Sequence, residues 1–179
     1  MLRVAAQNDN PEVLKLLLDA GAEVNRTNNE GDNPFWAACR HGRVENMKLL
    51  LVHGADPGPT RTKEALYTIL FYPTNWQATL IKSHLDMAIW HMDIRMIKLL
   101  HTTGNCSNKD IHCVDKSVLE RCVKPEVHEL LHELASTPRL LLSYCRLAVR
   151  DAMRVRRPSS VNKLPLPQKL RDYLLFSDL

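Results

Sequence analysis

The sequence predicts an all-α fold, in which a row of stacked helix pairs is followed by a helical C-terminal segment. Residues 11–23 return 33 positions later as residues 44–56, and both copies contain the pattern Leu-Leu-x-x-Gly-Ala. Leucines recur within each copy at the three- and four-residue spacing of an amphipathic helix. A repeat of about this length is typical of two-helix units that bury their apolar faces only against their neighbours.

Two further copies follow the first two. Residues 85–100 repeat the pattern, and Gly104 follows their second helix as Gly21 and Gly54 follow theirs. Glycine at this position suits the left-handed backbone that ends many helices. Gly104 lies 50 residues after Gly54, so 17 residues beyond one period are inserted, at about residues 58–76. A degenerate last copy at residues 116–134 is expected to cap the array.

Residues 33–38 indicate which repeat this is. They read Asn-Pro-Phe-Trp-Ala-Ala and stand where ankyrin repeats carry Thr-Pro-Leu-His-x-Ala, with a proline at the start of the first helix. On this turn and on the 33-residue period, residues 1–135 resemble ankyrin repeats. The resemblance implies an ankyrin-repeat solenoid of helix pairs joined by short hairpin loops. Trp36 occupies the histidine position and is expected to pack inside the repeat.

The ankyrin resemblance also implies a target-binding surface on the concave side of the array. Tryptophan beside arginine is a composition typical of binding hot spots, although Trp90 could equally pack against the inserted segment. The candidate substrate-binding residues are Asn29, Glu30, Asp32, Arg40, His41, Trp90 and His91.

The start of the chain differs from a complete repeat. Leu2 aligns with Phe35, so the first repeat is truncated and lacks its hairpin and turn. We expect the C-terminal part of a longer array, either a short isoform or a fragment. Aliphatic side chains left without a preceding repeat lower stability or promote self-association, because each loses burial free energy. The side chains expected to be partly uncovered are Leu2, Val4, Leu14 and Leu17.

The C-terminal segment carries two motifs in order. In the first, Leu141, Cys145 and Val149 recur every four residues and therefore form one stripe on a helix. In the second, prolines fix an extended segment immediately before a short helix, which is expected to place three side chains on one face. The extended residues are Leu164, Pro165, Leu166 and Pro167, and the helical ones are Leu170, Tyr173 and Leu174.

These two motifs at this spacing resemble a SOCS box, assigned to residues 136–179. The resemblance implies that Leu141, Cys145 and Val149 bind Elongin C, the partner of Elongin B. It also implies a Cullin-5-binding set, namely Leu164, Pro165, Leu166, Pro167, Leu170 and Tyr173. Ankyrin repeats followed by a SOCS box imply a non-catalytic substrate-recognition adaptor of a Cullin-5 and Elongin B/C ubiquitin ligase. Such an adaptor binds a protein substrate, unknown here, and promotes its ubiquitination and proteasomal degradation. An ankyrin scaffold or competitor that assembles no ligase remains the alternative.

Composition agrees with a folded soluble chain in the cytoplasm, with the nucleus as a further compartment. The chain is 45% hydrophobic and 25% charged, and it has neither a long apolar span nor a signal-peptide pattern, so no membrane partner is expected. Its five cysteines fall in no paired framework, which favours reduced thiols. Residues 138–179 hold nine Lys/Arg and three Asp, but the arginines interleave with the apolar stripe, and no nucleic acid is expected.

One enzyme-like motif requires its own interpretation. His128-Glu129-Leu130-Leu131-His132 matches the zinc-binding H-E-x-x-H pattern. A zinc hydrolase needs a third ligand, and only Asp151 follows at a plausible distance, inside the predicted docking helix. Repeat register already explains Leu130 and Leu131 as the leucine pair of the last copy. We therefore expect no metal and no cofactor, with a zinc hydrolase as the remaining enzyme alternative.

Overall fold

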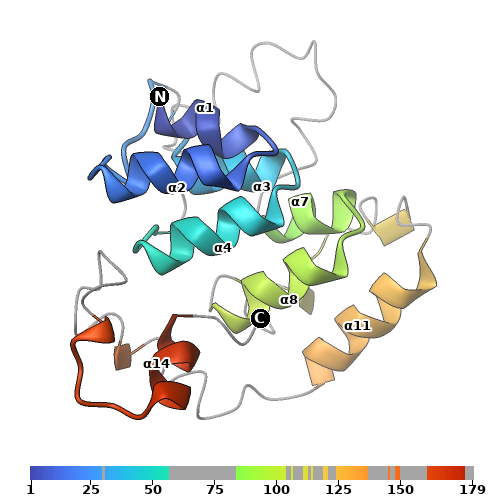
Figure 1. Ribbon diagram of the computed structural model, residues 1–179. Coiled ribbons are helices and arrows are strands. Elements are labelled where there is room, and N and C mark those ends of the chain that lie inside the picture. Colours follow the sequence, from blue (N-terminus) through green and yellow to red (C-terminus); the bar gives the residue numbers. More distant parts are fainter. Residues whose placement is uncertain are drawn as a thin grey trace. The chain divides into compact units, whose positions relative to one another are not determined.

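Helices make up all the regular structure in the part of the chain that the computed structural model describes (Figure 1). These residues are 1–29, 31–56, 84–103, 106, 111, 112, 114, 119, 120, 124–136, 145, 148, 149 and 161–175. They contain no strand, which confirms the predicted all-α fold. The inserted segment near residues 58–76 lies outside them. The chain divides into one unit of Met1–Arg26, Asn33–Pro57 and Arg139–Leu179, and another of Thr27–Asp32 and Gly58–Pro138.

The first repeat consists of α1 (Leu2–Gln7) and α2 (Pro11–Asp19). Asn10 starts α2, because its side-chain oxygen accepts hydrogen bonds from the backbone N–H groups of Glu12 at 3.1 Å and Val13 at 3.3 Å. Pro11 takes the first helical position, where its missing N–H costs nothing. Side-chain capping and proline thus fix where α2 begins.

The second repeat consists of α3 (Pro34–Arg40) and α4 (Val44–Val52). Asn33 caps α3 by accepting a 2.7 Å hydrogen bond from the backbone N–H of Trp36, and Pro34 follows it. Gly21 and Gly54 have φ angles of 87° and 84°, which confirms the left-handed backbone predicted after the second helix of each repeat. Gly104, the third glycine of this series, is outside the described residues.

The two repeats pack through consecutive helices: α1 contacts α2 and α3, and α4 contacts α2 and α3. The fully buried side chains between them include Leu14, Phe35, Met47 and Leu50. Trp36 is also buried, which confirms its predicted packing role. Asparagines in the loops join successive repeats: Asn25 donates to Gly54 O at 3.3 Å, and Asn33 donates to Asp56 O at 2.9 Å.

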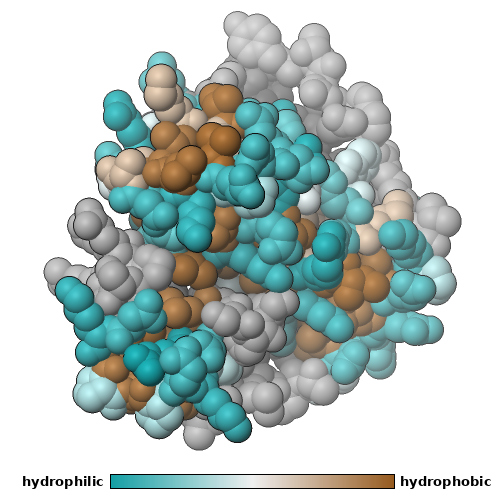
Figure 2. Space-filling model, in the orientation of Figure 1, coloured by the Kyte–Doolittle hydropathy of each residue, from teal (hydrophilic) through white to brown (hydrophobic). Residues whose placement is uncertain are grey.

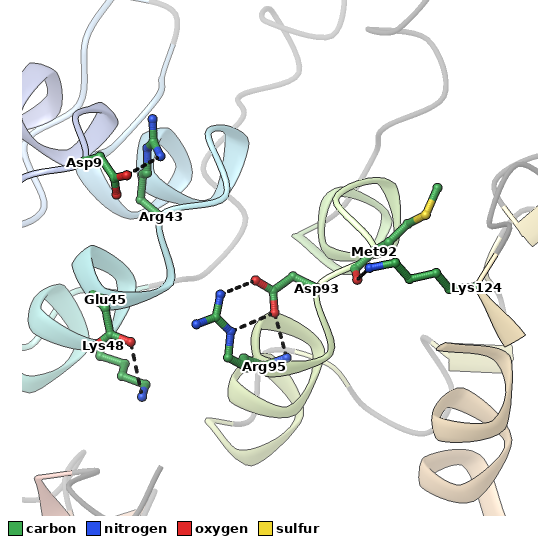
Figure 3. A network of polar contacts seen from close by, with 8 residues as sticks. All are labelled: Asp9, Arg43, Glu45, Lys48, Met92, Asp93, Arg95 and Lys124. Atoms are coloured by element: carbon green, nitrogen blue, oxygen red, sulfur yellow. Dashed lines mark hydrogen bonds and ion pairs between the residues drawn. The ribbon is translucent and has the colours of Figure 1, made fainter. Parts of the chain in front are cut away.

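A polar cluster crosses the boundary between the first two repeats. The buried Asn46 amide donates to the backbone oxygens of Ala6 at 3.1 Å and Asn8 at 2.7 Å, at the C-terminal end of α1. Arg43 donates from Nε to Gln7 O at 3.1 Å and forms a 3.2 Å ion pair with Asp9 (Figure 3). These side chains satisfy carbonyl groups that a helix end leaves without partners.

The prediction that Leu2 and Leu14 are uncovered is wrong. Leu2 is 8% exposed and Leu14 is fully buried, because both lie on the sides of α1 and α2 that pack against neighbouring helices. Val4 is exposed as predicted, and Leu17 is partly buried. The first helix pair is thus packed on one side, while exposed aliphatic side chains mark its other side.

The other unit contains the third repeat, formed by α7 (His84–Trp90) and α8 (Ile94–Thr102), and also α11 (Pro125–Ser136). Helix α8 packs against both α7 and α11. Leu130 and Leu131 are buried, as the repeat register predicts. The fully or almost fully buried side chains of this unit include Ile89, Met96, Ile97, Leu99, Leu100 and Val127.

The turn between α7 and α8 differs from its counterpart in the second repeat. Met92 has a φ angle of 52° and stands where the second repeat has Gly42, with a φ angle of 68°. A side chain on left-handed backbone raises the conformational energy. Asp93 then starts α8 by accepting a 2.9 Å hydrogen bond from the backbone N–H of Arg95 (Figure 3). Burial acts to raise the pKa of Asp93, but hydrogen bonds and the charge of Arg95 outweigh it and lower that pKa.

The C-terminal segment contains α14 (Gln168–Leu174). Pro167 immediately precedes it with φ −54° and ψ 148°, the extended conformation expected of the Leu-Pro-Leu-Pro segment. Among the described helices, none is long and apolar enough to cross a membrane.

Candidate protein-binding surfaces

The described C-terminal segment has a small apolar core of its own. Val161 is fully buried and Leu174 nearly so, and Leu164, Leu166 and Leu175 pack against them half-buried. Two backbone hydrogen bonds stabilise the turn at residues 161–166: Leu164 N donates to Val161 O at 3.1 Å, and Leu166 N donates to Leu164 O at 2.8 Å. This core fixes the extended segment relative to α14.

The same segment presents a different set of side chains to solvent. Pro165 and Pro167 are exposed, Leu170 is 44% exposed, and Tyr173 is partly exposed. The six residues predicted to bind Cullin-5 therefore fall into two groups. Leu164 and Leu166 contribute to the core, whereas the other four are exposed or partly exposed. Leu174 was grouped with Leu170 and Tyr173 on one face, but it points into the core instead.

Polar contacts support this arrangement. Arg171 donates from Nη1 to Asn162 O at 3.3 Å, which links α14 to the residues before the prolines. Gln168 donates to Asp172 Oδ1 at 2.6 Å one turn further along the helix. The Arg171 contact therefore ties α14 to the residues on the other side of the extended segment, and the Gln168 contact lies within α14.

The predicted Elongin C stripe is described only in part. Cys145 and Val149 have helical backbone and exposed side chains, four residues apart as predicted. Leu141 lies outside the described residues. The Cys145 thiol is free and exposed, whereas burial raises the pKa of the Cys39 thiol well above its usual value.

The candidate substrate-binding residues fall in both units. In the second repeat, Arg40 and His41 are exposed at the end of α3. At the equivalent positions of the third repeat, His91 is exposed and Trp90 is partly exposed at the end of α7. Each of these two helix ends thus places two long polar or aromatic side chains next to each other.

The loop residues of the predicted target surface differ from one another. Asn29 is exposed, and Glu30 is outside the described residues. Asp32 is only 3% exposed, and its backbone N–H donates to Asn28 Oδ1 at 2.8 Å. Burial of this kind fits a residue that shapes the loop and does not fit the predicted contact with a partner.

The H-E-x-x-H residues lie on α11. His128, Glu129 and His132 are exposed, while the two leucines between them are buried against the unit. Among the described residues, no group of three or more His, Cys, Asp or Glu side chains could hold a metal ion.

Two features that shape these surfaces were not predicted from the sequence. Val161 was not singled out, although an aliphatic residue three positions before Leu164 could have suggested a packing partner for α14. Asn46 was also missed, although it is a polar residue at a position where the other repeats have Val13 and Met96.

Comparison with known proteins identifies both parts of the chain. The SOCS box family model matches residues 137–175, and the model for ankyrin repeats, in three copies, matches residues 2–110. The chain is 29% identical to human ankyrin repeat and SOCS box protein 12 over 79% of its length, and covers 42% of that relative.

Two mouse proteins extend this similarity over more of the chain. Ankyrin repeat and SOCS box protein 16 is 31% identical over 89% of the chain, which covers 39% of that relative. Ankyrin repeat and SOCS box protein 14 is 28% identical over 99% of the chain, which covers 32% of that relative. The chain therefore spans less than half the length of each of these three relatives.

Proposed function

This chain belongs to the ankyrin-repeat and SOCS-box family, and on that premise we propose that it is a substrate-recognition adaptor of a ubiquitin ligase containing Elongin B, Elongin C and Cullin-5. The repeats bind a protein target, and the C-terminal segment binds the ligase. The observation that carries the proposal is that a SOCS-box segment, with outward prolines and leucine on a core of its own, follows the repeats in one chain.

The Cullin-5 assignment is supported by the rigidity and exposure of the second motif. Pro165 and Pro167 restrict the backbone before binding, so less conformational entropy is lost when a partner immobilises it. Leu170 exposes an aliphatic side chain that gains free energy on burial. Because Val161 and Leu174 anchor the segment from inside, the outward residues can bind without giving up their own packing.

The Elongin C assignment is supported by the first motif. Cys145 and Val149 are exposed on helical backbone at i, i+4 spacing, and Leu141 precedes them by one more such interval. A row of small and aliphatic side chains at this spacing suits a helix that lies in an apolar groove of a partner. Binding of Elongin C brings Elongin B with it.

The proposed role of the repeats is positional. Arg40 with His41, and Trp90 with His91, are the described candidates for target contact. A target held next to the ligase experiences a high effective concentration of the ubiquitin-transferring subunits, which carry out the chemistry. The adaptor itself needs no catalytic group. We further propose that it works in the cytoplasm, and also in the nucleus, where its thiols stay reduced.

Two variants of the full chain test this proposal by co-precipitation from cells. Leu141→Ala removes a predicted anchor side chain, and we expect Elongin C and Cullin-5 to be lost together, with a fall in affinity of at least about thirtyfold. Replacing Leu164, Pro165, Leu166 and Pro167 by alanine frees the extended segment, and we expect Elongin C to stay while Cullin-5 is lost. Lys163→Ala, at an exposed neighbouring position, is the matched control and should retain both partners.

The outcomes separate the ligase adaptor from the scaffold. Retention of Cullin-5 by the four-alanine variant contradicts the assignment of residues 164–167 to Cullin-5, and retention of Elongin C at parental level by Leu141→Ala contradicts the assignment of Leu141 to Elongin C. A parent chain that precipitates neither partner favours a scaffold that assembles no ligase. Fluorescence microscopy of the tagged chain tests the compartment, and an exclusively secretory location contradicts it.

A further inference from the structure

The outward side of the C-terminal segment carries positive charge as well as apolar side chains. Lys163 and Lys169 are both exposed, and Pro165 and Pro167 lie between them in the sequence. Lys169 is also the neighbour of Leu170, which is 44% exposed. Figure 2 shows hydrophilic and hydrophobic residues next to each other in the region of α14. This surface therefore combines an apolar centre with cationic flanks.

Alternating burial places one of the two lysines on the same side as the prolines. Leu164 and Leu166 pack against the core, whereas Lys163, Pro165 and Pro167 are exposed. In an extended chain, successive side chains point to opposite sides, so every second residue shares a side. The ammonium group of Lys163 is consequently presented next to the exposed proline rings.

The two lysines are the uncompensated charges of this segment. The other charged side chains of residues 161–175, Arg171 and Asp172, are partly buried, and each has a hydrogen bond within the segment. Within the described part of the chain, neither the Lys163 nor the Lys169 ammonium group has an ion pair or a hydrogen bond. Both groups are thus available to carboxylates of a partner.

On the basis of the proposed function, in which this segment binds Cullin-5, we propose that Lys163 and Lys169 face an acidic rim on that partner. The rim surrounds an apolar site that takes the outward prolines and Leu170. Protein interfaces commonly have this arrangement, with apolar side chains at the centre and charged ones at the edge. Because apolar side chains lie between the two amines, the surface fits a protein and does not fit the continuous phosphate backbone of a nucleic acid.

Charged and apolar residues then act on different steps of binding. Opposite charges attract at long range, before the surfaces touch, so the lysines increase the association rate. Exposed ion pairs at the edge of an interface add little to the stability of the complex once it has formed. Burial of Leu170 and the prolines forms only on contact and therefore sets the dissociation rate. The lysines select a partner by its charge, and the apolar residues retain it.

Surface plasmon resonance with purified proteins tests this assignment. The full chain, in complex with Elongin B and Elongin C, is passed over immobilised Cullin-5. Lys163→Glu with Lys169→Glu should slow association about tenfold at about 50 mM salt and change the dissociation rate less than about twofold. At about 500 mM salt the parent should associate more slowly, and its difference from the variant should fall below about twofold, because salt screens exposed charges.

Three further variants serve as controls. Lys163→Arg with Lys169→Arg keeps both charges and should associate at the parental rate. Lys15→Glu with Lys98→Glu changes the net charge equally at exposed positions in the repeats and should have little effect. Lys163→Ala removes one charge and should slow association only about two- to threefold, so that co-precipitation still recovers Cullin-5.

The outcomes distinguish this inference from the proposed function. If the parent complex binds Cullin-5 but the double glutamate variant associates at the parental rate, the acidic rim is wrong while the Cullin-5 assignment stands. The same holds if the parental rate does not depend on salt, or if the control substitutions in the repeats slow association equally. A parent complex that binds no Cullin-5 contradicts both the proposed function and the inference that rests on it.

Discussion

The repeats and the C-terminal segment bury their apolar side chains in different ways. In the second repeat, Phe35, Met47 and Leu50 are fully buried in a core shared with the first repeat. In the C-terminal segment, Val161 and Leu174 form the core, and Leu170 with two prolines remains outside it. Repeats gain stability from their neighbours, whereas a short segment with a small core gains it by binding a partner.

Because of this difference, substitutions in the two regions should have different effects on folding and binding. A change in the shared core of the repeats should alter folding, and with it all binding. A change on the outer side of the C-terminal segment should alter one interaction and leave folding intact.

The largest expected effect lies in the repeat core. Phe35→Ala removes a fully buried aromatic side chain between helices, and we expect a loss of about 3–5 kcal/mol in the free energy of unfolding. Leu170→Ala, at an exposed position, should change it by less than about 0.5 kcal/mol. Chemical denaturation of both variants measures this contrast. Equal destabilisation by the two substitutions contradicts the distinction between the regions.

Acid should destabilise the third repeat through His84. Burial lowers the pKa of His84 from its usual 6.5 to about 4, so the folded protein keeps this imidazole neutral. Below pH 6.5 the His84 imidazole binds a proton in the unfolded chain but not in the folded protein, so protonation favours unfolding. The free energy of unfolding is therefore at its full value above pH 6.5 and decreases as the pH falls toward 4. The pKa shift of His84 corresponds to a total decrease of about 3 kcal/mol in the free energy of unfolding.

The variant His84→Gln isolates this contribution. Denaturant unfolding of parent and variant at several pH values should show a smaller loss of stability for the variant between pH 6.5 and 4. An identical pH dependence of the two proteins contradicts the buried neutral histidine.

An intermediate effect is expected at the boundary of the first two repeats. Asn46→Ala leaves the carbonyl groups of Ala6 and Asn8 without the Asn46 amide as a donor, and we expect a loss of about 1–3 kcal/mol. Asn162→Ala changes an exposed asparagine of the C-terminal segment and should cost less than about 0.5 kcal/mol. The difference between the melting temperatures of the two variants measures how much the polar cluster contributes to stability.

The smallest effect is a gain in stability. Met92→Gly relieves a side chain on left-handed backbone, and we expect about 0.5–1 kcal/mol of stabilisation after the added flexibility of the unfolded chain is subtracted. The reverse change, Gly42→Met, should cost about 1–2 kcal/mol at the equivalent turn. Destabilisation by Met92→Gly contradicts the equivalence of the two turns.

Local features of the fold were predictable from sequence because they depend on neighbouring residues. The proline at the start of α3, and the glycine after the second helix of the first two repeats, were read directly from the pattern. The burial of Leu2 and Leu14 was not predictable in this way, because period alone does not say which side of the first helix pair faces its neighbour. The burial of Asp32 was not predictable for the same reason, because the repeat period does not show which loop side chains point inward.

The C-terminal segment shows a similar division. Its order of motifs and the extended prolines followed from sequence, since proline fixes its own backbone. The separation of Leu174, in the core, from Leu170, outside it, did not. Both residues fit one helical face, and only the packing of Val161 decides which leucine is buried.

The central claim, that the repeats bind a target while the C-terminal segment binds the ligase, is tested most directly by protein abundance in cells. We propose to identify proteins that co-purify with the parent chain and with the four-alanine variant of residues 164–167, and to measure their cellular levels with each. Our account predicts that both chains capture the same targets and that only the parent lowers their abundance, by a route that proteasome inhibition blocks. An equal decrease with both chains, or unchanged levels with the parent, would contradict it.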